Sequence, residues 1–403
     1  MEIIRIIPLL DFGGVEKRVK HTVIGFKLFS NQSLSVVVLG KKGKISEDLK
    51  SMGTHPIHLN QNFKIPNILL IFKLYRLLKN IRPDVVHTSA AEANFHGLIA
   101  AKMARVPVRI GEEIGFPKHD WKWRLIFKWV YKSATKVIAI SQAVKDRIVE
   151  LGEVEEEKVE VVYNPVSLGE REKGKGERGI GEKEENSGKE EGDVAESSKV
   201  EGALRFAPAE KAGRQSDVNN GESKKPFVFV TTCRLVPVKN LDTLVKVFAE
   251  IVEENQDLDL KLWIVGDGPE KGTLEVLAKD LGIQENVFFW GFHEDVVPYL
   301  EEADAFVLPS FSEGFSISLV EAMLCGLPSI VTNQGGPREI VEDGKTGFLI
   351  NPLKAYDIKS KMLEVLKLSN EQRQLIGEKA QEAGKKYSVE NYVKRLMEVY
   401  TTP

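Results

Sequence analysis

The sequence has few cysteines, no long apolar run and no dinucleotide-binding fingerprint, and each shortage excludes a class of protein. Its two cysteines, Cys233 and Cys325, are far apart in a chain of 403 residues, so neither a disulfide framework nor a thiolate metal site is expected. No segment supplies the roughly 20 apolar residues of a membrane-spanning helix. The GxGxxG spacing is missing, which disfavours a nicotinamide enzyme. The first residues lack the features of a secretory signal, and we expect a cytoplasmic protein.

Charge is distributed unevenly along the chain. Residues 1–167 contain 26 Lys and Arg against 17 Asp and Glu, whereas residues 226–403 contain 18 against 28. Two halves of opposite sign would attract each other across a cleft, and a basic half suits an anionic ligand or surface. No nucleic-acid-binding motif accompanies this charge, so nucleic acid is not expected as a partner.

The pattern of apolar residues predicts two α/β domains. In both halves, continuous β-branched runs such as "SLSVVVLG" and "FVFVTTCRL" alternate with segments of helical period. This pattern is typical of doubly wound parallel sheets that are covered on both faces. Residues 168–225 are charged, rich in Gly and nearly free of aromatics, which predicts a disordered linker. We therefore expect domains at 1–167 and 226–385, and a C-terminal helix at 386–403 that packs back on the first domain.

The stretch "SEGFSISLVEAMLCG" places two carboxylates near the start of an expected helix. Glu313 lies in a turn with Gly314, and Glu321 falls in the second turn of the helix, which Gly326 is suited to end. Both carboxylates can then reach a ligand that lies over the helix N-terminus, where free N–H groups attract phosphate. Alternatively, Glu313 is an ordinary turn residue and Glu321 a solvated helix residue.

Three other loops follow strand-like runs. In "TTCRLVPVKN", Arg234 and Lys239 can neutralise a diphosphate, and Asn240 is a candidate helix cap. In "IVGDGPE", Gly266 allows a ligand to approach the backbone closely. The pair Gly13-Gly14 in "LLDFGGVEKRV" allows the same at a helix start. Surface charge and simple tight turns explain each of these loops equally well when it is taken alone.

Taken together, these segments resemble a known family. Gly13-Gly14, "RLVPVKN", "VGDGP", "VFFWGFHEDV" and the long stretch from "PSFSEGF" to "KTGFLI" are similar to the retaining glycosyltransferases of family 4, glycosyl transferases group 1. The resemblance covers both domains and is most specific in the second, where Glu313 and Glu321 match the family's E-x7-E signature. It implies the GT-B fold, in which two Rossmann-like domains face each other across a cleft. The first would bind the acceptor and the second the nucleotide sugar.

The resemblance also implies residue roles. Glu321 would bind the ribose hydroxyls of a nucleotide sugar, Glu313 would hold the transferred sugar, and Arg234 with Lys239 would neutralise the leaving diphosphate. Donor contacts are implied at Gly14, Gly266, Phe292, Gly314, Phe315, Ser316 and Glu321. The family works without a metal or other cofactor, and the "DLD" at 257–259 is interpreted as a loop rather than a metal site.

One position departs from the family pattern. Many relatives have a histidine in the first-domain loop that corresponds to "RIGEEIGFP", where this chain has Glu112 and Glu113. A carboxylate can stabilise positive charge at the anomeric carbon or orient the acceptor hydroxyl, and we take Glu113 as the catalytic candidate. His87 and His96 are the remaining candidates, and either is equally well explained as structural.

Two segments of the first domain mix basic and aromatic residues. "KHDWKWRLIFKWVYKSATK" contains three of the five tryptophans, and residues 65–82 have a similar character. Such helices can lie in a lipid headgroup region, or they can pack their aromatics on the first sheet. The basic excess of this domain favours a peripheral site on an anionic membrane surface, at the inner face of the cell membrane.

The sequence therefore predicts a retaining, metal-independent glycosyltransferase. Its partners would be a UDP- or GDP-sugar and a glycan or lipid-linked acceptor, in the synthesis of cell-envelope glycans. A nucleotide-sugar epimerase of the same architecture is the alternative enzyme, because it would hold the same diphosphate and sugar. A non-enzymatic nucleotide-sugar-binding protein is the alternative outside catalysis.

Overall fold

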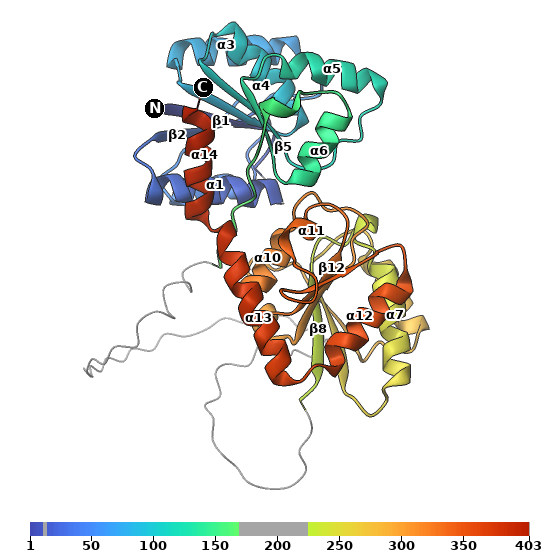
Figure 1. The fold of residues 1–403 in the computed structure, drawn as a ribbon. Coiled ribbons are helices and arrows are strands. Elements are labelled where there is room, and N and C mark those ends of the chain that lie inside the picture. The colour runs from blue at the N-terminus through green and yellow to red at the C-terminus, as the bar shows by residue number, and fades with distance from the viewer. Residues whose placement is uncertain (11–13, 169–224, 403) are drawn as a thin grey trace, which may run out of the picture. The chain divides into compact units, whose positions relative to one another are not determined.

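The structure is a computed structural model that describes residues 1–10, 14–168 and 225–402. The expected linker at 168–225 thus lies almost wholly outside the described residues, and the exact domain boundaries stay predictions. The described residues form two parallel sheets, as the apolar runs predicted, and each sheet is covered by helices on both faces (Figure 1). Both domains are Rossmann-like.

The first sheet has seven strands in the order β3-β2-β1-β4-β5-β6-β7. Its strands are β1 (Glu2–Ile7), β2 (Ser33–Val38), β3 (Ile57–His58), β4 (Val85–Ser89), β5 (Val108–Glu113), β6 (Lys136–Ala139) and β7 (Val159–Val161). Its helices are α1 (Gly14–Phe29), α2 (Lys44–Ser51), α3 (Ile68–Ile81), α4 (Ala91–Met103), α5 (Trp121–Tyr131) and α6 (Gln142–Glu150). The central strand β4 is buried along its whole length, as a strand with both faces covered must be.

The second sheet has six strands in the order β10-β9-β8-β11-β12-β13. Its strands are β8 (Phe227–Thr232), β9 (Leu260–Val265), β10 (Val287–Gly291), β11 (Ala305–Leu308), β12 (Ser329–Thr332) and β13 (Phe348–Ile350). Its helices are α7 (Leu241–Glu254), α8 (Lys271–Asp280), α9 (Val297–Glu302), α10 (Ile317–Leu324), α11 (Pro337–Ile340), α12 (Ala355–Lys367) and α13 (Asn370–Gly384). The strand order reverses between β8 and β11, and such a switch point is where sheets of this type bind ligands.

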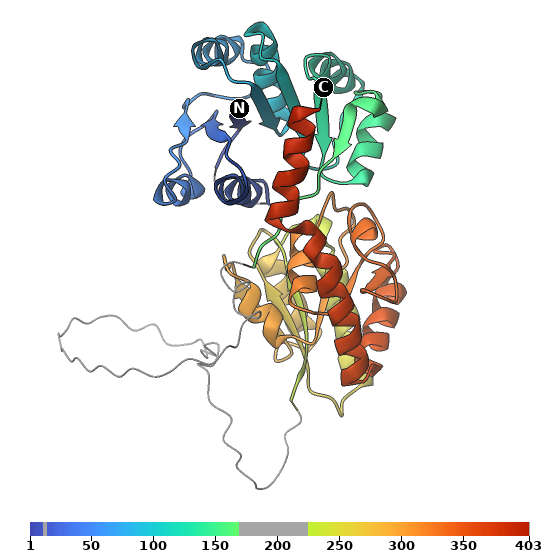
Figure 2. The same ribbon diagram turned by 60° about the vertical axis from the view of Figure 1, so that its left-hand side comes forward.

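The C-terminal helix α14 (Val389–Thr401) packs against α1 of the first domain. It lies beside α1 in both views of the ribbon (Figures 1 and 2), although the two helices are at opposite ends of the chain. Val393, Leu396 and Tyr400 share one buried apolar cluster with Ile3 and Phe26. Burial of this apolar face holds the end of the chain on the first sheet.

Candidate active site

The loops that follow β8 and β11 carry the charged residues that the sequence singled out. Arg234 and Lys239 lie between β8 and α7, and Glu313 lies between β11 and α10. The two strands are paired in the sheet, so both loops emerge at its switch point. The side chain of Asn240 joins the loops by donating to the carbonyl oxygen of Pro309 (3.2 Å).

The predicted cap role of Asn240 is wrong. Asn240 does occupy the N-cap position of α7, but its φ is 57° and its side chain makes no cap hydrogen bond. The amide instead donates to two carbonyl oxygens, those of Pro309 and Pro352. The residue thus orders neighbouring loops rather than the helix end.

Helix α10 presents its two carboxylates as the spacing predicted. Ser316 caps the helix by accepting from the backbone N–H of Leu319, which places Glu313 in the preceding loop and Glu321 in the second turn. Gly326 follows the helix with a φ of 77°, as expected for a glycine that ends it. The two carboxylates therefore occupy different positions around one helix N-terminus.

Glu313 is held by two neighbours. Lys239 Nζ forms an ion pair with its carboxylate, and Ser310 Oγ donates to the same oxygen at 3.1 Å. Both members of the ion pair are largely shielded from solvent. The carboxylate and the ammonium group are therefore fixed next to each other before any ligand arrives.

Arg234 contrasts with this ordered pair. Its side chain is exposed, and within residues 1–10, 14–168 and 225–402 it makes no hydrogen bond or ion pair. An unpaired guanidinium at the carboxyl end of a parallel sheet can accept an anion without first breaking an existing contact. Arg234 and Lys239 place two cations at this end of the sheet, and the carboxylate of Glu313 balances the charge of Lys239.

Glu321 is nearly buried, with 9% of its surface exposed, and its partner comes from the first domain. Lys17 Nζ, in the first turns of α1, lies 3.4 Å from its carboxylate. Burial raises the pKa of Glu321 above the ordinary value, and the charge of Lys17 opposes that rise. The sequence did not single out Lys17, although its place just after Gly13-Gly14 is a signal that could have done so.

The glycine loops approach other backbone segments closely. A Cβ on Gly266, whose φ is 148°, would lie 1.8 Å from the carbonyl oxygen of Cys233, and a Cβ on Gly268 would lie 2.3 Å from that of Leu235. The structure therefore explains both glycines by the packing of the β9 loop on the β8 loop. The expected contact of Gly266 with a ligand stays a prediction.

The remaining donor candidates lie around the same loops. Phe315 is buried and its ring lies 5.9 Å from that of Tyr163. Phe292 follows β10 and is exposed. A Cβ on Gly314 would come within 3.2 Å of the Cα atom of Gly115, in the loop after β5. Gly14 begins α1, while Gly13 lies outside the described residues.

Glu112 and Glu113 end β5 and, as neighbours in a strand, point to opposite faces of the sheet. Glu112 is fully buried between Arg5 (2.7 Å) and Arg18 (2.5 Å). Burial alone would raise the pKa of Glu112, but the charges of the two arginines outweigh it and hold that pKa well below the usual range. Its carboxylate therefore stays ionised inside the fold.

Glu113 is also buried, with 6% of its surface exposed. Its carboxylate accepts from the hydroxyl of Tyr131 and from the amide of Asn94 (3.3 Å). Burial raises the pKa of Glu113 to about 7, against the opposing effect of the Tyr131 hydrogen bond. No arginine or lysine pairs with it among the described residues, so its environment differs sharply from that of Glu112.

The two candidate histidines take part in structural contacts. His87 is buried, its Nδ1 lies 2.6 Å from the hydroxyl of Tyr400, and burial lowers the pKa of its imidazole to about 4. His96 accepts from the backbone N–H of Asn67 (3.1 Å), while its other nitrogen contacts the carbonyl oxygen of Glu92. These contacts favour the structural explanation for both residues.

Known protein families match both domains. The model described as Glycosyltransferase Family 4 matches residues 12–170, and the model described as Glycosyl transferases group 1 matches residues 214–383. The second match contains Arg234, Lys239, Glu313 and Glu321. The chain belongs to the family 4 glycosyltransferases. It is therefore an enzyme that transfers a sugar.

Curated relatives of this glycosyltransferase act on varied acceptors. An Escherichia coli protein named UDP-Gal:alpha-D-GlcNAc-diphosphoundecaprenol alpha-1,3-galactosyltransferase is 27% identical over 360 residues, which are 86% of this chain and 82% of that protein. The N-acetyl-alpha-D-glucosaminyl L-malate synthase of Bacillus anthracis is 36% identical over 162 residues, which are 40% and 41% of the two chains. The first name describes a lipid-linked acceptor and the second does not.

Solved structures share the GT-B fold of this glycosyltransferase. HepE from Anabaena in complex with UDP superimposes with a TM-score of 0.75 at 19% identity, covering 99% of each chain. A glycosyltransferase from Rickettsia africae gives 0.76 at 18% identity, covering 99% of this chain and 97% of that one. At this identity the likeness establishes the fold alone.

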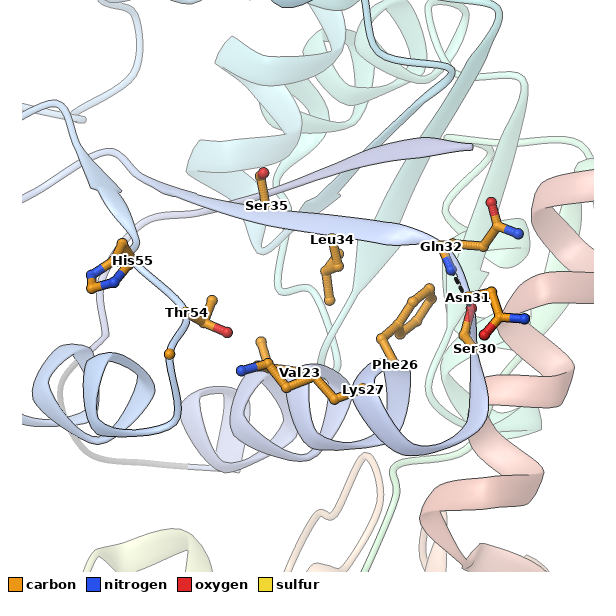
Figure 3. A pocket seen from close by; sticks show the side chains of 11 residues that line it. Val23, Phe26, Lys27, Ser30, Asn31, Gln32, Leu34, Ser35, Thr54 and His55 are labelled. Atoms are coloured by element: carbon orange, nitrogen blue, oxygen red, sulfur yellow. Dashed lines mark hydrogen bonds between the residues drawn. The ribbon is translucent and has the colours of Figure 1, made fainter.

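A pocket of about 440 Å³ in the glycosyltransferase lies away from these loops (Figure 3). It is formed by the second half of α1, the start of β2 and the segment before β3, with Lys27, Gln32 and His55 among its lining residues. Ligands of doubly wound sheets collect at the carboxyl ends of the strands, whereas this pocket is at the amino end of β2. We therefore do not assign the donor site to it.

The glycosyltransferase has a further cross-domain contact that sequence reasoning missed. Glu339 of α11 accepts from the backbone N–H groups of Gln142 (2.8 Å) and Ala143 (2.7 Å), at the start of α6. Glu339 follows Gly336, whose N–H donates to the carbonyl oxygen of Glu313. The sequence "GGPRE", which ends at Glu339, lies within the long stretch that carried the family resemblance, and this is the signal that could have indicated the residue.

Among the residues that the structure describes, no helix is both long and apolar enough to cross a membrane. The described part of the chain also has no group of three or more His, Cys, Asp or Glu side chains arranged to hold a metal ion.

Proposed function

We propose that this glycosyltransferase retains the anomeric configuration of the sugar and needs no metal ion. Its donor would be a UDP- or GDP-sugar, and its acceptor a hydroxyl of a lipid-linked saccharide at the inner face of the cell membrane. The observation that carries the proposal is the guanidinium of Arg234, which has no ion pair or hydrogen bond within the described residues and shares its loop with Lys239, the partner of Glu313. Two cations at one strand end supply the charge that a leaving diphosphate requires.

The family resemblance and the position of the two carboxylates around α10 support the remaining donor contacts that we propose. A diphosphate that lies over the N-terminus of α10 meets free backbone N–H groups and the positive end of the helix dipole. Glu313, which precedes the helix, then faces the transferred sugar. Glu321, one and a half turns further on, faces the ribose hydroxyls. Phe292 lies near the base in this arrangement, and Gly14, Gly266 and Gly314 to Ser316 provide backbone contacts.

Arg234 and Lys239 would act most strongly in the transition state. Negative charge grows on the diphosphate oxygens as the bond to the sugar breaks, and groups that are already oriented stabilise this charge without reorganisation. Because these two cations lie where a divalent metal would otherwise be needed, we propose transfer without a metal. Glu113 stays the proposed catalytic residue of the first domain, and the hydrogen bonds of Tyr131 and Asn94 to one of its carboxylate oxygens orient it at the end of β5.

A panel of nucleotide sugars tests the proposal. UDP-, GDP- and ADP-sugars are incubated with lipid-linked and soluble saccharides in the presence of a chelator, and the products are identified by mass spectrometry and NMR. We expect one donor class to yield a glycoside that keeps the donor's anomeric configuration. An inverted product, a strict metal requirement, or an epimerised nucleotide sugar without acceptor would each contradict the proposal.

Glu321→Ala tests the donor assignment within the same assay. Removing a charged hydrogen-bond acceptor of the ribose should raise the donor KM about 10- to 100-fold, with a smaller effect on kcat. The matched control is Glu275→Ala, an exposed carboxylate in α8. An unchanged donor KM for Glu321→Ala would exclude this residue from donor binding.

A further inference from the structure

One face of helix α5 packs against the rest of the first domain, and the opposite face is exposed. Phe127, Val130 and Tyr131 are buried, and Trp123 packs against Phe127 with their rings 6.2 Å apart. On the other side, Trp121, Leu125 and Trp129 are 67%, 61% and 57% exposed. Trp121 and Trp129 are the two exposed tryptophans of the described chain, so this basic and aromatic segment packs one face on the domain and leaves its other face exposed.

The outward residues of α5 form a single stripe. At 100° per residue, Trp121, Leu125 and Trp129 fall within an arc of about 80° along one side of the helix. Three exposed lysines, Lys122, Lys128 and Lys132, widen the same arc to only about 120°. The ammonium group of Lys122 lies 5.5 Å from the centre of the Trp121 ring. Apolar and cationic side chains are therefore presented together.

Helix α3 repeats this combination. Ile68, Leu69 and Phe72 are exposed at its start, while Leu70, Ile71 and Leu74 are buried. The exposed basic residues Lys73, Arg76 and Lys79 follow. Helices α3 and α5 both pack against α4 and lie in the layer that covers one face of the first sheet (Figure 1). We call the exposed side chains of these two helices the α3–α5 surface.

Acidic residues are nearly absent from the α3–α5 surface. Residues 61–83 contain no Asp or Glu, and residues 114–145 contain one, Asp120. The carboxylate of Asp120 is engaged in capping α5, where it accepts from the N–H groups of Lys122 and Trp123. A surface without free carboxylates is attracted to a negatively charged partner over its whole extent.

We infer that the α3–α5 surface docks on an anionic phospholipid bilayer. Tryptophan rings prefer the headgroup level of a membrane, and lysines beside them pair with lipid phosphates. The excess of acidic residues in 226–403 would repel the second domain from the same membrane, which leaves the first domain as the docking side. The inference deepens the proposed function, on which it rests for the biological context, because it brings the first domain to a lipid-linked acceptor.

Vesicle flotation tests the inference with the full-length protein and without any nucleotide sugar. The probes are vesicles of phosphatidylcholine alone and of phosphatidylcholine mixed with phosphatidylglycerol. We expect binding to the mixed vesicles only, with roughly fivefold weaker binding for each lysine removed in Lys122→Gln and Lys128→Gln.

The double variant Trp121→Ser/Trp129→Ser should lose about tenfold in affinity for the mixed vesicles. The double variant Val276→Ser/Leu375→Ser, at similarly exposed apolar residues of α8 and α13, is the matched control and should bind normally.

Three results would overturn the inference. One is equal binding by wild type and Trp121→Ser/Trp129→Ser, and another is equal binding to both kinds of vesicle. The third is a wild-type dimer that Trp121→Ser/Trp129→Ser dissociates, because a second copy would then cover the surface.

Docking and transfer can fail separately. Arg234→Ala should float as the wild type does while losing transfer. Trp121→Ser/Trp129→Ser should keep transfer to a water-soluble saccharide while losing flotation. A wild-type protein that transfers sugar but does not float would contradict the docking alone.

Discussion

The two domains each bring arginine and glutamate side chains together, but they use these charges differently. In the first domain, Glu112 is fully buried and forms ion pairs with two buried arginines, Arg5 and Arg18. In the second domain, Arg234 is exposed and unpaired within the described residues, beside the partly shielded Lys239–Glu313 pair. Charges that the fold has already satisfied hold elements together, whereas a charge that is left over is available to a ligand.

The buried cluster also explains how the chain's end is fastened. The hydroxyl of Tyr392, on α14, accepts from Arg5 (3.4 Å) and from Arg18 (3.3 Å), and that of Tyr400 contacts His87. These contacts join the C-terminal helix to the same arginines that surround Glu112. The ion pairs of Glu112 with Arg5 and Arg18 therefore have a structural role. Removing them should lower the stability of the fold rather than act directly on sugar transfer.

The largest effect is expected for Glu112→Ala. The change leaves Arg5 and Arg18 buried without a counter-charge, which should lower the free energy of unfolding by about 3 to 5 kcal/mol. Chemical denaturation followed by circular dichroism measures it. Glu160→Ala, which removes a partly exposed partner of Arg395, is the control and should cost less than about 1 kcal/mol. A cost below that of the control would show that the buried cluster does not stabilise the fold.

Arg234→Ala should lower the rate of sugar transfer without lowering stability, which is the opposite of the effect expected for Glu112→Ala. Because the side chain of Arg234 makes no hydrogen bond or ion pair with the described residues, its loss should leave the melting temperature unchanged. The loss of one cation from the leaving diphosphate should lower kcat about 10²- to 10³-fold, which is about 3 to 4 kcal/mol. Steady-state kinetics with the donor found in the panel measures it. Lys271→Ala, at the start of α8, is the basic control and should be neutral. Wild-type turnover in Arg234→Ala would remove this residue from the site.

The sequence predicted the positions of the charged residues in the second domain more fully than the buried ion pairs of Glu112 in the first domain. The alternation of apolar runs predicted both sheets, and the turn at Gly314 with the helical spacing up to Gly326 predicted a loop position for Glu313 and a second-turn position for Glu321. These predictions depend on residues close together in the chain. Lys17 and Glu321, by contrast, are paired across 304 positions, and no local pattern encodes such a contact.

Glu112 and Glu113 show the same limit most clearly. The sequence presents them as an equivalent pair, and strand alternation predicts only that they face opposite sides. Which side contains two arginines, and which contains Tyr131 and Asn94, depends on how α1, α4 and α5 pack. The structure thereby gives neighbouring carboxylates opposite pKa shifts, lowered for Glu112 and raised for Glu113.

Glu113→Gln tests that contrast, and its effect on the free energy of unfolding should be the smallest of the three. The pKa of Glu113 is about 7 in the fold against an ordinary value of 4.5, so the folded state binds more protons between these pH values. Stability contributed by the neutral carboxyl is then present below about pH 4.5 and is lost as the pH rises through 7. Glutamine does not ionise, so the variant should gain up to about 3 kcal/mol relative to wild type between pH 4.5 and 8.

Denaturation of both proteins across this pH range measures the difference. The imidazole of His119, which lies near Glu113, titrates in both proteins, so its contribution should largely cancel. Glu160→Gln, at a partly exposed carboxylate, should follow wild type at every pH. If the difference in the free energy of unfolding between Glu113→Gln and wild type does not change with pH, Glu113 is ionised in the fold at neutral pH. Its carboxylate would then be a second buried charge of the first domain, and the contrast with Glu112 would disappear.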